Sequence, residues 1–337
     1  MGQNGEEKGG GYQPVFAGID FAYPDETQTH FHFIFYIAIM LFGNTAHKSE
    51  NFEINFNIER FISTDRRILG GKGAKGMNST IRKFIFRDLQ TVEGYIDPPD
   101  ALVFLSLLKA QTERGLNGGI AEIGVYYGRT YFLFRKISGK RGRILAIDLF
   151  DIEQAPGGAE TQYSRFIDNG RRLGLPIDED LVIRRDSARV QADEIVGKIG
   201  YARFFSIDGG PMLHHVTADS RLAADSLADH GIIAFDDTFN PAWPEVTVGL
   251  ADFLRQREGT FSAFCMTKYR TYVCRSQFYE FYCNVIKKAP DLLAFEHLET
   301  QFLGSKVARL HNPLGRRILY ELMVRSGMSV FSERVYR

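Results

Sequence analysis

The chain has 337 residues, of which 44% are hydrophobic and 24% are charged, the balance of an ordinary globular protein. Its 41 basic and 41 acidic residues cancel, so no overall positive field attracts nucleic acid and we expect no nucleic-acid partner. The three cysteines, Cys265, Cys274 and Cys283, form no CxxC pair. This favours reduced thiols in a cytoplasmic protein over a disulfide framework or a zinc site.

The first 76 residues differ in character from the rest of the chain. They begin with a glycine-rich stretch and contain an aromatic-rich apolar run at 30–42, shorter than the roughly 20 residues that a membrane-spanning helix needs. The run also lacks the features of a signal peptide, so we expect no membrane span. A Gly/Lys linker at 70–76 ends just before Met77. We interpret Met77 as the natural start and 1–76 as a poorly structured upstream extension; a poorly packed accessory region is the alternative.

From Met77 onward, short apolar runs alternate with helical patterns, which predicts βαβ units and a parallel sheet. A helix at 101–114 comes first, with Pro98 and Pro99 at its start, where proline is favourable. The runs expected to form strands are 119–124, 143–149, 181–185, 202–208, 231–236, 260–267 and 270–275. The other helices are expected near 129–137, 160–173, 187–198, 212–229, 245–257, 278–289 and 313–326, with a further strand around 306–310.

This pattern divides the chain into the extension 1–76, an α/β domain at 77–285 and a C-terminal accessory segment at 286–337. The accessory segment could complete a substrate pocket or form the interface of a homo-oligomer. In an open parallel sheet, ligands bind beyond the carboxyl ends of the strands. The residues that end each apolar run are therefore the candidates for function.

The first run ends in a turn that contains Glu122, Gly124, Tyr126 and Gly128. The glycines let a ligand approach the backbone. A dinucleotide motif would need glycine at position 126, so that pyrophosphate can touch the backbone, and Tyr126 obstructs that approach. Glu122 adds a negative charge where a diphosphate would lie, whereas S-adenosylmethionine has no phosphate and carries a cationic sulfonium and ammonium. The turn therefore favours S-adenosylmethionine over NAD.

Acids also end the second and third runs. Asp148 follows the glycine turn at the spacing at which an acid accepts both ribose hydroxyls, a signal for adenosine that both cofactors share. Asp186 and Ser187 stand where the adenine would lie, and Asp186 could accept a hydrogen bond from its amino group. Capping of the next helix is the alternative role for these two residues.

Three more acids, Asp208, Asp236 and Asp237, end the fourth and fifth runs. On neighbouring strands their carboxylates would converge at the rim, beside the reactive methyl group. Oxygen ligands grouped in this way suit Mg²⁺ or a similar divalent ion, which could orient a substrate hydroxyl and lower its pKa. The alternative is that Asp208 caps a turn, while Asp236 or Asp237 binds backbone amides or the methionine part of the cofactor.

Taken together, the blocks at 122–128, 146–151, 206–209 and 231–237 resemble class I S-adenosylmethionine-dependent methyltransferases, most closely the branch of macrocin-type (macrolide-sugar) O-methyltransferases. The resemblance covers roughly residues 95–275. It implies an α/β fold: a three-layer Rossmann-like sheet of seven strands in the order 3-2-1-4-5-7-6, the last strand antiparallel, with N- and C-terminal additions. It also implies that Asp208, Asp236 and Asp237 hold a divalent metal. The expected cofactor-binding residues are Glu122, Gly124, Tyr126, Gly128, Asp148, Asp186, Ser187 and Asp208.

One position departs from the family pattern. The family shows Asp-Gly-x-His at the end of the fourth strand, with that His as the candidate general base, but Pro211 stands here. His214 and His215 follow, and a helix would place His214 on roughly the same face as Pro211. A neutral imidazole suits a base near pH 7, so His214, His215 and Asp208 are the candidate catalytic residues. A structural role is the alternative for the two histidines.

The loop 238–244 follows the Asp236–Asp237 pair and contains Trp243, the sole tryptophan of the chain. Its prolines stiffen it, and an aromatic side chain there could stack on a sugar or ring substrate. Asn240 and Trp243 are therefore candidate substrate contacts. Packing of Trp243 onto the sheet is the alternative.

The sequence thus predicts a cytoplasmic S-adenosylmethionine-dependent O-methyltransferase that acts on a hydroxyl of a small molecule or a sugar-containing natural product, with Mg²⁺ as a second cofactor. A non-catalytic S-adenosylmethionine-binding or interaction protein is one alternative, motivated by Pro211. A NAD-dependent dehydrogenase is another, which Tyr126 and Glu122 count against.

Overall fold

The computed structural model describes residues 75–150, 161–328 and 332–336. The interpretations of residues 1–74, including the apolar run at 30–42, lie outside the described residues. Met77 lies within α3 (Lys75–Lys83), the first described helix, and its role as the natural start stays a prediction. Among the described helices, none is both long enough and apolar enough to cross a membrane.

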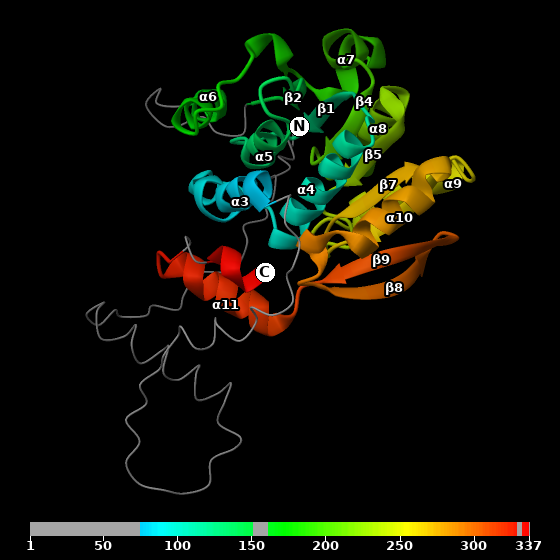
Figure 1. Cartoon of the computed structure of the whole chain (residues 1–337). Helices are drawn as coiled ribbons and strands as arrows, with labels where there is room; N and C mark the ends of the chain where they lie inside the picture. Colours follow the sequence, from blue (N-terminus) through cyan, green and yellow to red (C-terminus); the bar gives the residue numbers. More distant parts are fainter. Residues whose placement is uncertain (1–74, 151–160, 329–331, 337) are drawn as a thin grey trace, which may run out of the picture. The chain divides into compact units, whose positions relative to one another are not determined.

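A nine-stranded sheet has the order β3-β2-β1-β4-β5-β7-β6-β9-β8, and its first seven strands follow the expected order (Figure 1). β1 to β5 run parallel to one another, while β7 is antiparallel to both β5 and β6, as predicted. The strands are β1 (Gly119–Ile123), β2 (Ile144–Asp148), β3 (Val182–Arg184), β4 (Ala202–Ile207), β5 (Leu227–Phe235), β6 (Phe261–Met266), β7 (Thr271–Arg275), β8 (Glu296–Phe302) and β9 (Ser305–His311).

The two strands beyond the expected seven come from the C-terminal segment. β9 is the strand expected around 306–310 and pairs in parallel with β6, so the sheet continues past residue 285. β8 was not expected, because its side chains are mostly exposed at the edge of the sheet and its sequence shows no apolar run. The described part of the 286–337 segment therefore extends the sheet of the α/β domain.

Helices cover both faces of the sheet and enclose one hydrophobic cluster on each face. The first cluster contains side chains of α4 (Pro98–Glu113), α5 (Arg129–Ser138), α6 (Gln162–Arg172) and α10 (Tyr279–Lys288). The second contains side chains of α7 (Ala192–Ile199), α8 (Leu213–Asp225) and α9 (Pro244–Gln256). The helix expected at 187–198 is divided into a short 3-10 turn and α7, and α8 ends at Asp225 because β5 begins two residues later.

The beginning and the end of the described chain pack together. The Arg82 guanidinium lies 2.6 Å from Asp291 and 3.5 Å from Glu333, and it donates a hydrogen bond to the backbone oxygen of Tyr336. The ring of Phe86, in the π-helical turn Phe84–Asp88, stacks on Tyr336. The last described α-helix, α11 (Leu314–Arg325), also contributes Tyr320 to this aromatic group. The C-terminal segment is thereby fixed to the helical start of the α/β domain.

Candidate active site

The carboxyl ends of the parallel strands form a continuous rim. The amide of Asp208 donates to the backbone oxygen of Ile123, and the amide of Asp236 donates to that of Ile207. Asp208, the first residue after β4, thus lies beside the end of β1, and Asp236, the first residue after β5, lies beside the end of β4. Because the rim residues continue the strand ladder, their positions follow from the strand order and not from loop conformation.

The turn after β1 requires glycine at two positions. Gly124 has a φ of 78°, and a Cβ there would lie 1.7 Å from the carbonyl oxygen of Asp208. Gly128 has a φ of 91° and is the N-cap residue that precedes α5, and its Cβ would meet Phe132 and Phe166 at 2.6 Å. Tyr126 adopts a left-handed conformation with a φ of 53° between them, which a bulky residue rarely does. Backbone of this kind concentrates at ligand sites.

Asp148, at the end of β2, fixes the same turn from the neighbouring strand. Its Oδ2 accepts hydrogen bonds from the amides of Val125 and Tyr126 at 2.6 and 2.9 Å, and its Oδ1 accepts from the amide of Phe150 at 2.8 Å. The carboxylate is therefore occupied by three backbone donors. The expected bidentate contact with both ribose hydroxyls is not open in this conformation, because too few acceptor sites remain.

At the end of β3, Asp186 has the capping role that the sequence left as an alternative. Its Oδ1 accepts from the amide of Ala188 at 2.9 Å and caps the turn Ser187–Arg189. Ser187 lies near Asp219 of α8, a carboxyl that is 1% exposed. Burial raises the pKa of Asp219 to about 6, while the nearby Ser187 hydroxyl opposes the rise. A Cβ at Gly209 would lie 2.8 Å from Asp219, so this acid adjoins the loop after β4.

Glu122 lies inside the sheet, not on the surface of the turn. It is 1% exposed on β1, and among the described residues its Oε2 has no hydrogen-bond partner. The hydroxyl of Ser206, which lies opposite Glu122 on β4, is also buried and also has no hydrogen-bond partner among the described residues. Burial raises the pKa of Glu122 well above its usual range, which favours the neutral acid. The negative charge expected at the turn is therefore disfavoured by the position of Glu122 inside the sheet.

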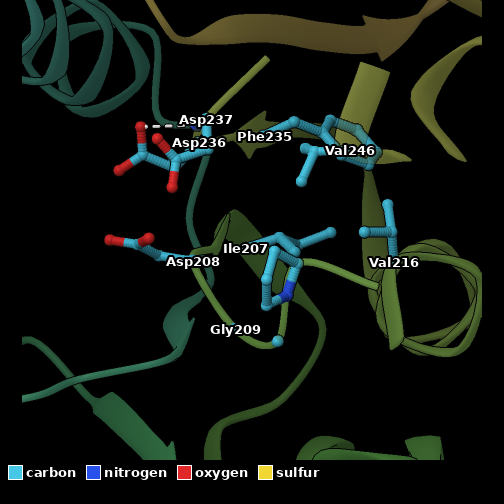
Figure 2. A pocket seen from close by; sticks show the side chains of 10 residues that line it. Ile207, Asp208, Gly209, Val216, Phe235, Asp236, Asp237 and Val246 are labelled. Carbon is cyan, nitrogen blue, oxygen red and sulfur yellow. Dashed lines mark hydrogen bonds between the residues drawn. The ribbon is translucent and has the colours of Figure 1, made fainter. Parts of the chain in front are cut away.

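Figure 2 shows a small pocket at the ends of β4 and β5. The carboxylates of Asp208, Asp236 and Asp237 lie on one side of the view, and the apolar side chains of Ile207, Val216 and Val246 lie on the other. Burial and the charge of Asp236 raise the pKa of Asp208 well above its usual range. Its side chain nevertheless keeps about a third of its surface exposed, so a bound molecule can reach it.

Arg270, which the sequence interpretation missed, lies against these acids. It stands in the tight connection between β6 and β7 and is 2% exposed. Its Nη2 donates a hydrogen bond to Oδ2 of Asp236 and lies 3.9 Å from Oδ2 of Asp208. The predicted strand order contained the signal for it. β7 is antiparallel to β5, so the residue just before β7 lies next to the residue just after β5.

The three rim acids do not form the expected magnesium site. The Oδ1 of Asp236 accepts from the amide of Asp237, and its Oδ2 accepts from Arg270. The Oδ1 of Asp237 accepts from Asn240 at 2.7 Å. Within residues 75–150, 161–328 and 332–336, no group of three or more His, Cys, Asp or Glu is arranged to hold a metal ion. The residues present therefore do not fit a divalent ion in this arrangement, because Arg270 and backbone or side-chain donors engage both oxygens of Asp236 and one oxygen of Asp237.

The candidate base histidines lie in the first turn of α8. This helix begins at Leu213, so Pro211 is not part of it, and the expected common face of Pro211 and His214 is wrong. The imidazole of His215 covers Gly210, where a Cβ would lie 2.1 Å from Nδ1. Among the described residues this Nδ1 is buried and has no partner. The exposed His214 packs against the His215 ring at 4.0 Å, and neither ring lines the pocket.

The loop after Asp237 separates the two candidate substrate contacts. Asn240 donates to Asp237 and accepts from the amide of Ala242, so its side chain serves the loop itself. Trp243 precedes α9 and is 43% exposed, which does not match the alternative of a packed core residue. Phe239 is 47% exposed and meets Phe302 of β8 edge-on at 5.5 Å. The C-terminal hairpin therefore reaches the loop beside the rim acids.

One protein family matches the part of the chain that forms this rim. Residues 121–238, from β1 to the loop after β5, match the family described as methyltransferase domain. No curated protein matches the chain.

Solved structures of methyltransferases show weaker similarity. The O-methyltransferase NovP is 13% identical, with 52% of this chain and 78% of NovP covered at a TM-score of 0.43. CalS11, a TDP-rhamnose 3'-O-methyltransferase of calicheamicin biosynthesis, is 16% identical, with coverages of 63% and 99% and a TM-score of 0.40. An O-methyltransferase from Bacillus cereus in complex with SAH is 16% identical, with coverages of 64% and 94% and a TM-score of 0.38.

Proposed function

We propose that this chain, whose residues 121–238 match the family described as methyltransferase domain, transfers the methyl group of S-adenosylmethionine to a hydroxyl oxygen of a small molecule or a sugar-containing natural product. The proposal rests mainly on one contact at the carboxyl ends of the strands in the matched segment. The turn after β1, which accepts only glycine at position 124, touches the loop that begins with Asp208. The turn that would bind the cofactor therefore lies next to Asp208, the acid that would lie beside the methyl group.

The residues at this rim suit a cationic nucleoside. A bound ligand can lie against the backbone of Gly124 and Gly128, where no Cβ intervenes. The unpartnered Oε2 of Glu122, within the described part of the chain, is an acceptor suited to an ammonium group. Such a group would favour the ionised form of this acid. Asp148 would hold the turn and accept from one ribose hydroxyl, while Ser187 and Asp219 would adjoin the adenine.

The bound cofactor supplies an activated methyl group on a cationic sulfur. The protein then has to position an acceptor hydroxyl in line with the carbon–sulfur bond and remove one proton. We assign the proton to Asp208, because it lines the pocket and its side chain remains partly exposed. The charge of Arg270 favours the ionised form of this acid, and in that form its raised pKa makes it a stronger base than an ordinary aspartate. His215 is the second candidate, since its Nδ1 has no partner among the described residues.

Exposed aromatic side chains favour an acceptor with a ring or an apolar part. Trp243 and Phe239 lie in the loop that follows the rim acids, and aromatic faces stack on sugars and ring systems. Asn240, which the sequence pointed to as a substrate contact, would instead keep this loop in shape. No metal ion takes part in the proposed reaction, because Asp236 already accepts a hydrogen bond from Arg270 and Asp237 already accepts one from Asn240.

Thermal unfolding in the presence of ligands tests the cofactor assignment. S-adenosylhomocysteine should raise the melting temperature of the full chain, because a ligand that binds the native state stabilises it, whereas NAD should leave it unchanged. Stabilisation by NAD alone would replace the proposal with a dehydrogenase. Transfer of labelled methyl groups from S-adenosylmethionine to a panel of hydroxylated sugars and phenols tests the reaction. Binding of S-adenosylhomocysteine without any transfer would favour a non-catalytic binding protein.

A further inference from the structure

We infer that the guanidinium of Arg270 is the resident cation of the acidic rim, so that Asp208 and Asp236 act at this site without a divalent metal ion. The inference rests on the proposed function, since it concerns the acids that would meet the acceptor hydroxyl. It replaces the expectation of a magnesium site with a charge that the chain itself provides.

The position of Arg270 follows from the sheet. The last paired residues of the antiparallel β5–β7 ladder are Phe235 and Thr271, so Asp236 and Arg270 are the next residues on each side. The backbone oxygen of Arg270 also accepts from the amide of Thr267, which closes the connection between β6 and β7. The pairing of β5 with β7 and the tight turn between β6 and β7 therefore position the guanidinium beside Asp236.

A second buried group keeps the guanidinium in place. Asp100, near the start of α4, accepts hydrogen bonds from Thr267 at 2.7 Å and from Tyr272 at 2.6 Å, and these residues flank Arg270 in sequence. Its negative charge acts on Arg270 together with those of Asp236 and Asp208. The guanidinium carbon lies 5.0 Å from the centre of the Phe104 ring, a cation–π arrangement. Release of Arg270 would leave the buried Asp100 and the half-buried Asp236 without their cation, which is unfavourable.

The same arrangement disfavours a metal ion. Mg²⁺ demands six nearly octahedral oxygen ligands at about 2.1 Å, several of them carboxylate or water. An ion bound between Asp208 and Asp236 would lie within a few ångströms of the guanidinium, and an arginine cannot lose its proton to relieve the repulsion. Both oxygens of Asp236 already accept hydrogen bonds, one of them from Arg270. A divalent ion would have to displace a buried cation before it could bind.

In the proposed reaction, the acceptor oxygen forms a bond to the methyl carbon as the carbon–sulfur bond breaks and its electron pair returns to sulfur. The acceptor O–H bond breaks, and its proton passes to Asp208. Arg270 touches Asp236 and lies 3.9 Å from Asp208, so it is a positioning residue that acts through these acids. Its fixed positive charge offsets their mutual repulsion, the task that a metal would otherwise perform.

Metal binding can be measured directly on the full chain, without any acceptor. Titration of the wild-type protein with MgCl₂ or MnCl₂ should give no heat of binding and no rise in melting temperature. With an acceptor found in the panel of sugars and phenols, EDTA should also leave methyl transfer unchanged. In Arg270→Met the acids lose their cation, and Mg²⁺ should now raise the melting temperature. Arg255→Met, which alters an exposed arginine of α9, should show no such gain.

Several outcomes would overturn the inference. They are saturable Mg²⁺ binding to the wild-type protein, loss of methyl transfer in EDTA with recovery in Mg²⁺, or equal Mg²⁺ responses of Arg270→Met and Arg255→Met. Should Arg270→Met fail to fold, Arg270→Lys keeps the charge and should retain both the indifference to Mg²⁺ and part of the activity, and the wild-type titration still decides. If S-adenosylhomocysteine does not bind at all, the proposed function fails, while the metal titration still reports on the acidic rim.

Discussion

The backbone carbonyl of Asp208 closes over Gly124 so tightly that a Cβ on Gly124 would lie 1.7 Å from its oxygen. This contact joins the loop after β1 to the loop after β4, two neighbouring strands whose ends would hold the cofactor and the acceptor. Because the obstruction is backbone and not a flexible side chain, it cannot be relieved by a rotamer change. The two loops must therefore keep this distance for the rim to form.

Gly124→Ala should accordingly destabilise the protein and abolish cofactor binding. The left-handed φ of 78° alone disfavours alanine by roughly 1–2 kcal/mol, and the clash with the Asp208 carbonyl adds to this cost. We expect the free energy of unfolding in urea to fall by more than about 2 kcal/mol. Gly197→Ala is the matched control, because Gly197 lies within α7 with open space around it and alanine favours helices. Equal effects of the two substitutions would contradict this explanation.

Asp148 provides a second prediction, because its carboxylate holds the same turn through the amides of Val125 and Tyr126. Hydrogen bonds to a charged group contribute roughly 1.5–3 kcal/mol each, so Asp148→Ala should weaken binding of S-adenosylhomocysteine at least tenfold. Isothermal titration calorimetry gives the affinity directly. Asp252→Ala, at an exposed acid of α9, should bind the ligand as the wild type does. Undiminished affinity in Asp148→Ala would remove this residue from the cofactor site.

The sheet could be predicted from the sequence because each of its central strands is a short buried apolar run. Those runs place Asp208 and Asp236 at one edge of the sheet, which hydrogen bonds from their amides to Ile123 and Ile207 confirm. β8 could not be predicted in this way, because the side chains of this exposed edge strand show no apolar pattern in the sequence. The same limit applies to Asn240 and Asp186, whose partners are backbone groups and neighbours that only the folded loops define.

The electrostatics of the site were the least predictable part. Sequence identifies Glu122 as an acid, but its neutral preference comes from its position inside β1, where burial raises the pKa. In the same way, three acids at strand ends suggest a metal site until the groups that donate hydrogen bonds to them are known. Arg270 is distant in sequence from all of them, and its proximity to Asp236 emerges only when β7 is placed antiparallel beside β5. The family resemblance supplied that strand order, but a search for carboxylates does not look for the cation opposite them.

Asp219 should make the stability of the fold depend on pH. Its pKa is raised from 3.8 to about 6 in the folded protein, so folding favours the protonated form. The stability from this group is fully present below pH 3.8 and is lost as the pH rises through about 6. The rise corresponds to roughly 3 kcal/mol at 1.36 kcal/mol per pH unit, as an upper bound.

Asp219→Asn removes this titration while it keeps the shape of the side chain. Relative to the wild type, the variant should gain stability between about pH 4 and pH 8, as measured by urea unfolding at both values. Asp252→Asn, at an exposed acid, should show the same pH dependence as the wild type. A constant difference between Asp219→Asn and the wild type across this range would show that Asp219 does not titrate as described.

Trp243 and Phe302 should affect the acceptor and not the cofactor. Trp243 is 43% exposed, and Phe302 supports Phe239 from the C-terminal hairpin, so each substitution by alanine removes aromatic surface beside the rim acids. Loss of one stacking contact of about 0.5–1.5 kcal/mol should raise KM for the acceptor roughly two- to tenfold. The affinity for S-adenosylhomocysteine should stay unchanged, because neither residue lies in the turns after β1, β2 or β3. Val248→Ala, at an exposed residue of α9, serves as the control. If Trp243→Ala and Phe302→Ala changed kcat and cofactor affinity but left KM unaltered, these aromatic residues would belong to the framework of the site and not to its acceptor wall.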